Sequence, residues 1–132
     1  MTALDTNVLV RFLVRDDERQ ARIVLARFRR AESGRERLWV PLVVTLELLW
    51  VLDSAYDFDR DEILDALARL RHMAILAFEA EDVVDRTLAG GRGARMDLAD
   101  LVIGHAARAQ GSDTTLTFDR RAARSDLFEL LS

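Results

Sequence analysis

Short apolar segments alternate with helix-like segments along most of the chain, and this alternation is the feature that most limits the possible folds. The apolar segments at 1–4, 38–40, 73–78 and 114–118 are too short for helices, and we predict a β-strand at each. Strands that alternate with helices form mainly parallel sheets covered on both faces. The sequence therefore predicts an α/β fold, a three-layer α/β/α sandwich with a mainly parallel central sheet.

The helices are predicted from apolar residues at helical spacing and from residues that cap helix ends. Asp59 and Glu62 form a capping box before Ile63, Leu67 and Leu70, which predicts a helix there. The sequence GGRGAR at 90–95 is predicted as a loop, and 114–118 as the last strand. The other predicted helices cover 7–14, the segment from Asp16 or Asp17 to about Ser33, 42–52, 81–88 and 97–110.

Length and composition favour a single domain. The chain has 132 residues, the length of one ordinary domain, and half of them are hydrophobic, which is enough for a sizeable core. Its one proline, Pro41, and its six glycines are concentrated nowhere except in GGRG at 90–93. We therefore predict one continuous domain over residues 1–132.

Several classes of protein are excluded by what the sequence lacks. No apolar stretch approaches the roughly 18 residues of a membrane span, and the first residues do not resemble a signal peptide. We therefore expect a soluble cytoplasmic protein with no membrane partner. The chain has no cysteine, which excludes a disulfide framework, a thiolate nucleophile and a zinc site built on sulfur. Any metal is then bound by oxygen or histidine.

The charged residues limit the chemistry further. The net charge of −4 argues weakly against a general nucleic-acid coat, but a nuclease can gather its acids in a metal site. All 19 cations are arginine, and there is no lysine. A response-regulator receiver and a P-loop protein both need a lysine, so these interpretations fail. A phosphatase that forms an aspartyl phosphate usually has a second aspartate where this chain has Asn7.

Five acidic residues stand among apolar neighbours in the sequence. Asp5 and Asp119 end predicted strands, Glu47 interrupts VVTLELLWVL, and Asp97 and Asp100 lie within MDLADLVIGHAA. A buried carboxylate costs several kcal/mol unless a partner compensates for it. In parallel α/β sheets, ligands bind beyond the carboxyl ends of strands, where Asp5 and Asp119 are predicted to lie.

A divalent metal would make a cluster of these acids tolerable. Mutual repulsion raises the pKa values of gathered carboxylates unless a cation neutralises them. Ligand sets made only of oxygen favour Mg²⁺ or Mn²⁺, and a metal-bound water can attack phosphorus. We therefore predict a Mg²⁺ site, with Mn²⁺ as an alternative. Asp97 and Asp100 share one face of their predicted helix, although Asp97 is explained more simply as its N-terminal cap.

Four segments resemble, in order, the signature blocks of the PIN domain family, and within it the VapC type ribonuclease toxins of toxin–antitoxin pairs. They are LDTNVLVRFL, VVTLELLWVL, MDLADLVIGHAA and LTFDRRAA, which together span residues 4–123. The resemblance implies that Asp5, Glu47, Asp100 and Asp119 are the catalytic residues and form an acidic quartet around Mg²⁺. Asp5 and Asp100 would be its most direct ligands.

The resemblance also implies supporting residues. Asn7 would orient the carboxylate of Asp5, while Thr6 and Thr117 would flank the site. Ordinary strand-end chemistry explains Thr117 equally well. A further group of arginines flanks the predicted site in the sequence, and these either contact the RNA backbone or form solvated surface. They are Arg92, Arg95, Arg120, Arg121 and Arg124.

The activity implied by the resemblance is Mg²⁺-dependent hydrolysis of single-stranded or looped RNA. VapC type toxins are inhibited by a cognate antitoxin protein and usually form homodimers, so both partners are expected here. The apolar stretches at 8–14 and 46–52, with Trp39 and Trp50 nearby, are candidates for these contacts or are plain core. Two alternatives stay open: a PIN-like module that binds RNA or protein without cutting it, and a housekeeping PIN nuclease without an antitoxin.

Overall fold

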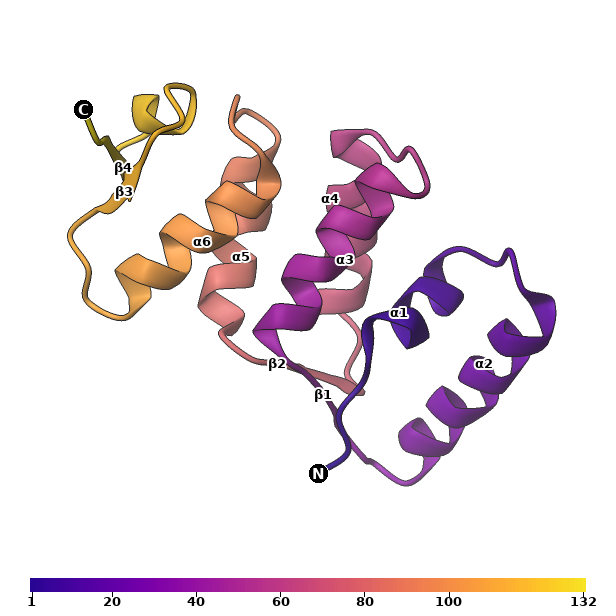
Figure 1. The fold of residues 1–132 in the computed structure, drawn as a ribbon. Helices are drawn as coiled ribbons and strands as arrows, with labels where there is room; N and C mark the ends of the chain where they lie inside the picture. The colour runs from indigo at the N-terminus through magenta and orange to yellow at the C-terminus, as the bar shows by residue number, and fades with distance from the viewer. The chain divides into compact units, whose positions relative to one another are not determined.

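The computed structural model describes residues 1–132 and divides the chain into two compact units, Met1–Glu79 and Ala80–Ser132 (Figure 1). Each unit is described by itself below. The first contains α1 (Thr6–Leu13), α2 (Glu18–Ser33), β1 (Leu38–Val40), α3 (Leu42–Ser54), α4 (Arg60–Arg71) and β2 (Leu76–Phe78). The second contains α5 (Glu81–Gly91), α6 (Leu98–Ala109), β3 (Thr115–Thr117), the short 3₁₀ helix η1 (Ala122–Arg124) and β4 (Phe128–Leu130).

The first unit is built on a buried pair of parallel strands. β1 pairs with β2, with Leu38 opposite Leu76. The start of the chain adds to this pair, because Ala3 bridges Trp39 in parallel and the N–H of Leu4 donates to the Trp39 carbonyl at 2.9 Å. The first predicted strand is therefore reduced to a single bridge. The chain then turns directly into α1.

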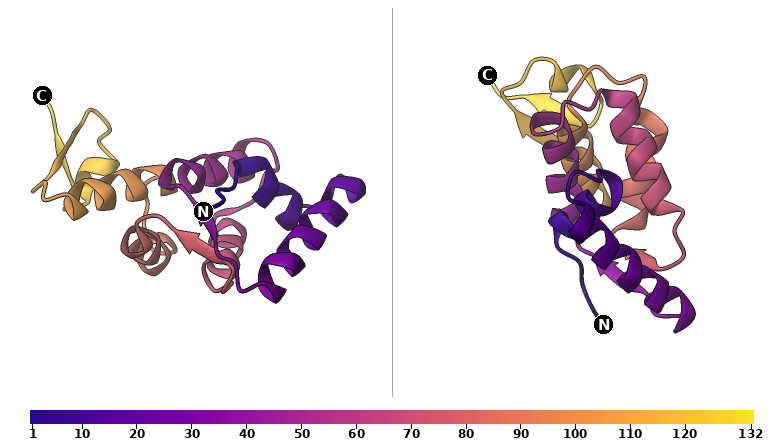
Figure 2. Two further views of the ribbon diagram at one scale, coloured as in Figure 1. Left: turned by 90° about the horizontal axis from the view of Figure 1, so that it is seen from below. Right: turned by 90° about the vertical axis from the view of Figure 1, so that its right-hand side faces the viewer.

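Helix caps explain why the helices of the first unit begin where they do. The side chain of Asp17 accepts a hydrogen bond from the N–H of Gln20 at the start of α2. Asp59 and Glu62 form the predicted capping box at the start of α4. Helix α1 packs against α2 and α3, and α1 and α2 lie side by side in both views of Figure 2. The predictions of these helices are confirmed to within two residues at their starts.

The second unit contains a helix pair and a second pair of parallel strands. Helix α5 packs against α6, and β3 pairs with β4, with Thr115 opposite Phe128. The prediction that 114–118 is the last strand was wrong, because β4 follows it. A strand of three residues is too short to show an alternating pattern.

Two other predicted boundaries were wrong. Helix α5 continues to Gly91, so the first two residues of the predicted loop at 90–95 are helical, and Gly91 is buried there. Burial compensates for the weak helix propensity of glycine. Strand β2 begins at Leu76, while residues 73–75 belong to the turn that follows α4.

In the second unit, the backbone of α6 lies very close to core side chains, and this contact fixes the position of the helix. A Cβ atom added to Gly104 would lie 3.0 Å from both Leu127 Cβ and Phe128 Cε2. Only glycine allows α6 to pack this tightly against the start of β4. Because β4 pairs with β3, this packing also brings the helix that carries Asp100 near the strand that leads to Asp119.

The predicted fold class, an α/β fold with parallel strands, is confirmed. The structure contains two parallel strand pairs, one in each unit. No helix combines the length and the apolar character that crossing a membrane requires.

Candidate active site

Asp119 lies in a turn that its own neighbours hold in place. The Oγ1 atom of Thr117 accepts a hydrogen bond from the N–H of Asp119 at 3.0 Å. The Oδ1 atom of Asp119 in turn accepts from the N–H groups of Arg121 at 2.8 Å and Ala122 at 3.3 Å. These bonds fix the carboxyl group just after the end of β3, and Asp119 as a whole is exposed. Thr117 therefore orients the turn that carries the acid.

Asp100 lies in the first turn of α6 and is half-buried. Burial raises its pKa above the ordinary value, and the negative charges of Asp97 and Asp119 raise this pKa further. Asp97 stands at the N-cap position of α6, as predicted, but its side chain forms no capping hydrogen bond. Asp97 and Asp119 therefore lie near enough to Asp100 for their negative charges to disfavour its ionised form.

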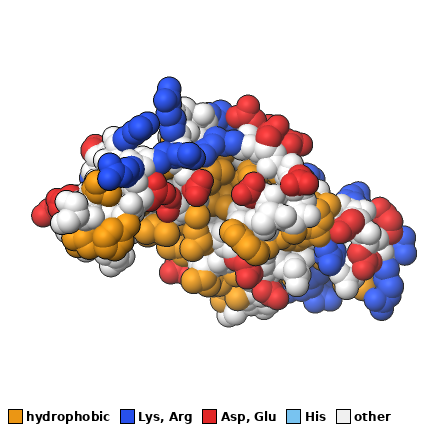
Figure 3. All heavy atoms as spheres, turned by 45° about the horizontal axis from the view of Figure 1, so that its top comes forward, with side chains coloured by type: hydrophobic (Ala, Val, Ile, Leu, Met, Phe, Trp, Pro, Cys, Tyr) orange, Lys and Arg blue, Asp and Glu red, His pale blue; other side chains and the backbone are white.

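An open hollow of about 660 Å³ adjoins these acids. Two acids, three arginines and one aromatic ring line it. Figure 3 shows arginine side chains gathered together on one face of the molecule. The lining residues of the hollow are Asp97, Phe118, Asp119, Arg120, Arg121 and Arg124.

Three of the five predicted RNA-contact arginines therefore line this hollow. Arg92 and Arg95 are exposed but are not part of its lining. Phe118 was missed by the sequence analysis, although its ring is 79% exposed. Its position in the sequence could have identified it, because it lies between Thr117 and Asp119, two predicted site residues in the segment LTFDRRAA.

In the first unit, Asp5 caps α1. Its Oδ1 atom accepts a hydrogen bond from the N–H of Thr6 at 2.8 Å, and its side chain is exposed. Glu47 is exposed on α3, and neither acid forms an ion pair with an arginine. The expectation that these acids lie in apolar surroundings was wrong. The apolar neighbours of Glu47 in the sequence, Leu48 and Leu49, are buried on other faces of α3, and Leu4, which precedes Asp5, is also buried.

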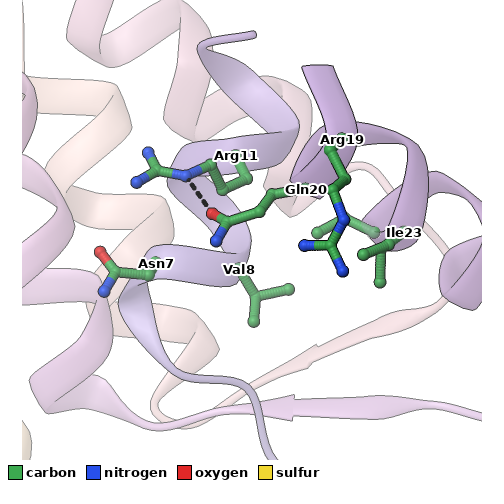
Figure 4. A pocket seen from close by; sticks show the side chains of 7 residues that line it. Asn7, Val8, Arg11, Arg19, Gln20 and Ile23 are labelled. Atoms are coloured by element: carbon green, nitrogen blue, oxygen red, sulfur yellow. Dashed lines mark hydrogen bonds between the residues drawn. The ribbon is translucent and has the colours of Figure 1, made fainter. Parts of the chain in front are cut away.

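The threonines and the asparagine of the first unit have different environments. Thr6 is only 3% exposed, and its Oγ1 atom has no hydrogen-bond partner. Thr45, two residues before Glu47, is buried in the same way and was missed by the sequence analysis. Asn7 lines a groove between α1 and α2 together with Arg11 and Gln20 (Figure 4). The role predicted for Asn7 at Asp5 stays a prediction.

The predicted quartet is divided between the two units. Asp5 and Glu47 belong to the first, and Asp100 and Asp119 to the second. Their convergence therefore stays a prediction. Within each unit, no group of three or more acidic or histidine side chains is arranged to hold a metal ion.

The chemistry of the acids nevertheless fits a hard divalent cation. All the candidate ligands are carboxylate oxygens, which Mg²⁺ and Mn²⁺ prefer. In the second unit, the like charges that raise the pKa of Asp100 are those that a bound cation would neutralise.

Comparison with known proteins gives one match. The family model described as PIN domain matches residues 2–126, nearly the whole chain. No curated protein and no solved structure matches the chain. PIN domains are generally nucleases and usually depend on a divalent metal.

Proposed function

The chain belongs to the PIN domain family, and from this premise we propose that it is a Mg²⁺-dependent endoribonuclease. It hydrolyses phosphodiester bonds in single-stranded or looped RNA. The observation that carries the proposal is the family match over residues 2–126. The charge crowding of Asp97, Asp100 and Asp119 beside an arginine-lined hollow supports it.

In this proposal, the metal would be held by the acidic quartet that the resemblance implies, Asp5, Glu47, Asp100 and Asp119. When bound, Mg²⁺ supplies an acidified water and stabilises negative charge on the phosphate. Mn²⁺ has the same ligand preference and is expected to replace it. Asp97, exposed at the start of α6, adds negative charge that strengthens the attraction for the cation.

The remaining residues of the site bind and orient the substrate. Arg120, Arg121 and Arg124 present guanidinium groups that hydrogen-bond to phosphate oxygens. Thr117 keeps the turn before them in one conformation through its hydrogen bond with the Asp119 N–H. Without metal, the acids repel phosphate, so the arginines and the cation act together.

The resemblance to VapC type sequences supports the proposal of a toxin role. We propose a cognate antitoxin and a homodimer in the cytoplasm. Val43 and Trp50 on α3, which are 73% and 63% exposed, support the existence of a protein contact there. A short neighbouring reading frame that encodes a small DNA-binding protein would support the toxin role. Its absence would favour a housekeeping nuclease.

A cleavage assay tests the enzymatic proposal. The purified protein is incubated with an RNA that contains a hairpin loop, in Mg²⁺, in Mn²⁺ and in EDTA. We expect cleavage in either metal, none in EDTA, and none by Asp5→Ala in Mg²⁺. Asp53→Ala, an exposed acid on α3, serves as the control and should cut normally.

Two results would contradict the proposal. Cleavage that EDTA leaves unchanged would exclude a metal-dependent reaction. Cleavage that persists in Asp5→Ala would remove this acid from the site. RNA binding without any cleavage in either metal would identify the non-catalytic binding module instead.

A further inference from the structure

Phe118 is an exposed aromatic residue in a chain that otherwise buries most of its large apolar side chains. Phe118 is 79% exposed, and its ring forms no aromatic pair and no cation–π contact. Packing of the core therefore does not explain it. It directly precedes Asp119 and lines the same hollow as that acid.

The backbone on both sides of Phe118 is held by hydrogen bonds. Thr117 accepts from the Asp119 N–H through its side chain, and its carbonyl accepts from the N–H of Leu131 at 2.7 Å. Asp119 is fixed in turn by the N–H groups of Arg121 and Ala122. A ring on such a segment is presented in a constant position, which lowers the entropy cost of binding to it.

The surroundings of the ring indicate what it binds. Five of the six residues that line the hollow are charged, and three of these are arginines. A protein-docking surface is depleted of charged residues at its centre, so this hollow does not resemble one. Cationic groups beside an aromatic ring are the combination that proteins use for single-stranded nucleic acid, with arginines on phosphates and the ring on a base.

We propose that Phe118 is a stacking platform for one unpaired base of the RNA, next to a phosphate that the arginines of the hollow hold. This inference rests on the proposed function for the identity of the ligand. Bases of a duplex are already stacked on their neighbours and do not present a free face, whereas bases of a loop or single strand do. Phe118 therefore gives the enzyme its preference for unpaired RNA.

Binding of a fluorescent RNA tests this inference without cleavage. The probe is a hairpin with 2-aminopurine in its loop, titrated in EDTA at low salt against the wild type, Phe118→Tyr and Phe118→Leu. Stacking on an aromatic ring quenches the probe. We expect quenching by the wild type and by Phe118→Tyr. For Phe118→Leu we expect little quenching and about tenfold weaker binding.

Matched controls separate stacking from general apolar contact. Leu116→Ala changes an exposed apolar residue of β3, two positions before Phe118, that does not line the hollow, and should leave quenching intact. Phe118→Leu should bind a fully paired RNA as well as the wild type does. Its salt dependence should also be unchanged, because the arginines that contact phosphates remain. Thermal melts should show that the exposed substitution leaves the fold intact.

Three outcomes would overturn the inference. These are absence of quenching by the wild type, equal quenching by Phe118→Leu, and equal loss of paired and unpaired RNA binding in that variant. The proposed function fails separately. If the protein cleaves RNA in Mg²⁺ but quenching is the same with and without the Phe118 ring, only the stacking platform is rejected. If quenching requires the Phe118 ring but no cleavage occurs in Mg²⁺ or Mn²⁺, only the hydrolysis is rejected.

Discussion

The acids of the two units lie in different environments. In the first unit, Asp5 uses one carboxylate oxygen to cap α1, and Glu47 is exposed on the surface of α3. In the second unit, burial raises the pKa of Asp100, and the charges of Asp97 and Asp119 raise this pKa further. The arginine-lined hollow belongs to the second unit as well.

This difference indicates a division of roles. The second unit combines crowded negative charge, an arginine-lined hollow and an exposed aromatic residue, and under the proposed function it would contribute both metal ligands and substrate contacts. The first unit offers carboxylates that are exposed and not paired with arginine, and these are suited to act as additional ligands. Each prediction below tests whether the roles are divided in this way.

The largest expected effect comes from removing one acid of the quartet in each unit. Glu47→Gln and Asp119→Asn should each lower the rate of RNA cleavage by at least about 100-fold, because each removes a charge that holds the cation. The measurement is single-turnover cleavage of a loop-containing RNA in saturating Mg²⁺. Asp53→Asn on α3 and Asp113→Asn before β3 are exposed matched controls.

The comparison between units decides what these variants mean. Loss of activity in both would support one site that both units share. Full activity in Glu47→Gln, together with loss in Asp119→Asn, would remove Glu47 from the site and reject the quartet. Full activity in Asp5→Ala as well would restrict the chemistry to the second unit.

Local signals in the sequence were sufficient for much of the fold. The caps at Asp17 and Asp59 act within one helical turn, so their effect is visible in a few consecutive residues. Strand β4 was missed because its three residues pair with β3 through backbone hydrogen bonds, which any sequence can form. The packing of α6 at Gly104 depends on Leu127, which is distant in the chain.

The environment of the site was harder to predict. Glu47 was expected to lie in an apolar setting, yet it shares an exposed face of α3 with Val43 and Trp50 while Leu48 is buried. Sequence neighbours on a helix point in different directions, so an apolar run does not make each of its residues buried. Phe118 was missed for a related reason, because an aromatic residue in a strand usually belongs to the core.

A smaller effect is expected from the arginines of the hollow. The combined variant Arg120→Gln, Arg121→Gln and Arg124→Gln should bind single-stranded RNA about tenfold or more weakly. The slope of log affinity against log salt concentration should be less steep by about 2. This is because three phosphate contacts are lost, and each releases about 0.7 counterions on single strands. The measurement is a fluorescence anisotropy titration at several salt concentrations.

A triple variant in the first unit provides the matched control. Arg22→Gln, Arg29→Gln and Arg30→Gln change three exposed arginines of α2 and alter the net charge by the same amount. Its binding and its salt dependence should stay close to those of the wild type. Equal losses in the two triple variants would mean that net charge alone attracts the RNA and that the hollow has no special role.

The smallest expected effect concerns stability without metal. The pKa of Asp100 is raised in the folded protein, so its charged form is less favourable there than in the unfolded chain. This penalty is fully present above the folded pKa and disappears as the pH falls below the ordinary value of 3.8. In EDTA at pH 7, Asp100→Asn should therefore melt at the same or a higher temperature than the wild type, and any advantage should shrink toward pH 4.

Added Mg²⁺ should reverse this order. A cation that binds only the folded state stabilises it, so the wild type should gain thermal stability in Mg²⁺ and Asp100→Asn should gain less. Glu47→Gln, an exposed position in the first unit, is the matched control for the metal-free melts. A fall of several degrees for Asp100→Asn in EDTA would mean that this carboxylate stabilises the fold through a structural partner. The crowding of acids in the second unit would then be a feature of packing, and the contrast between the two units would lose its functional meaning.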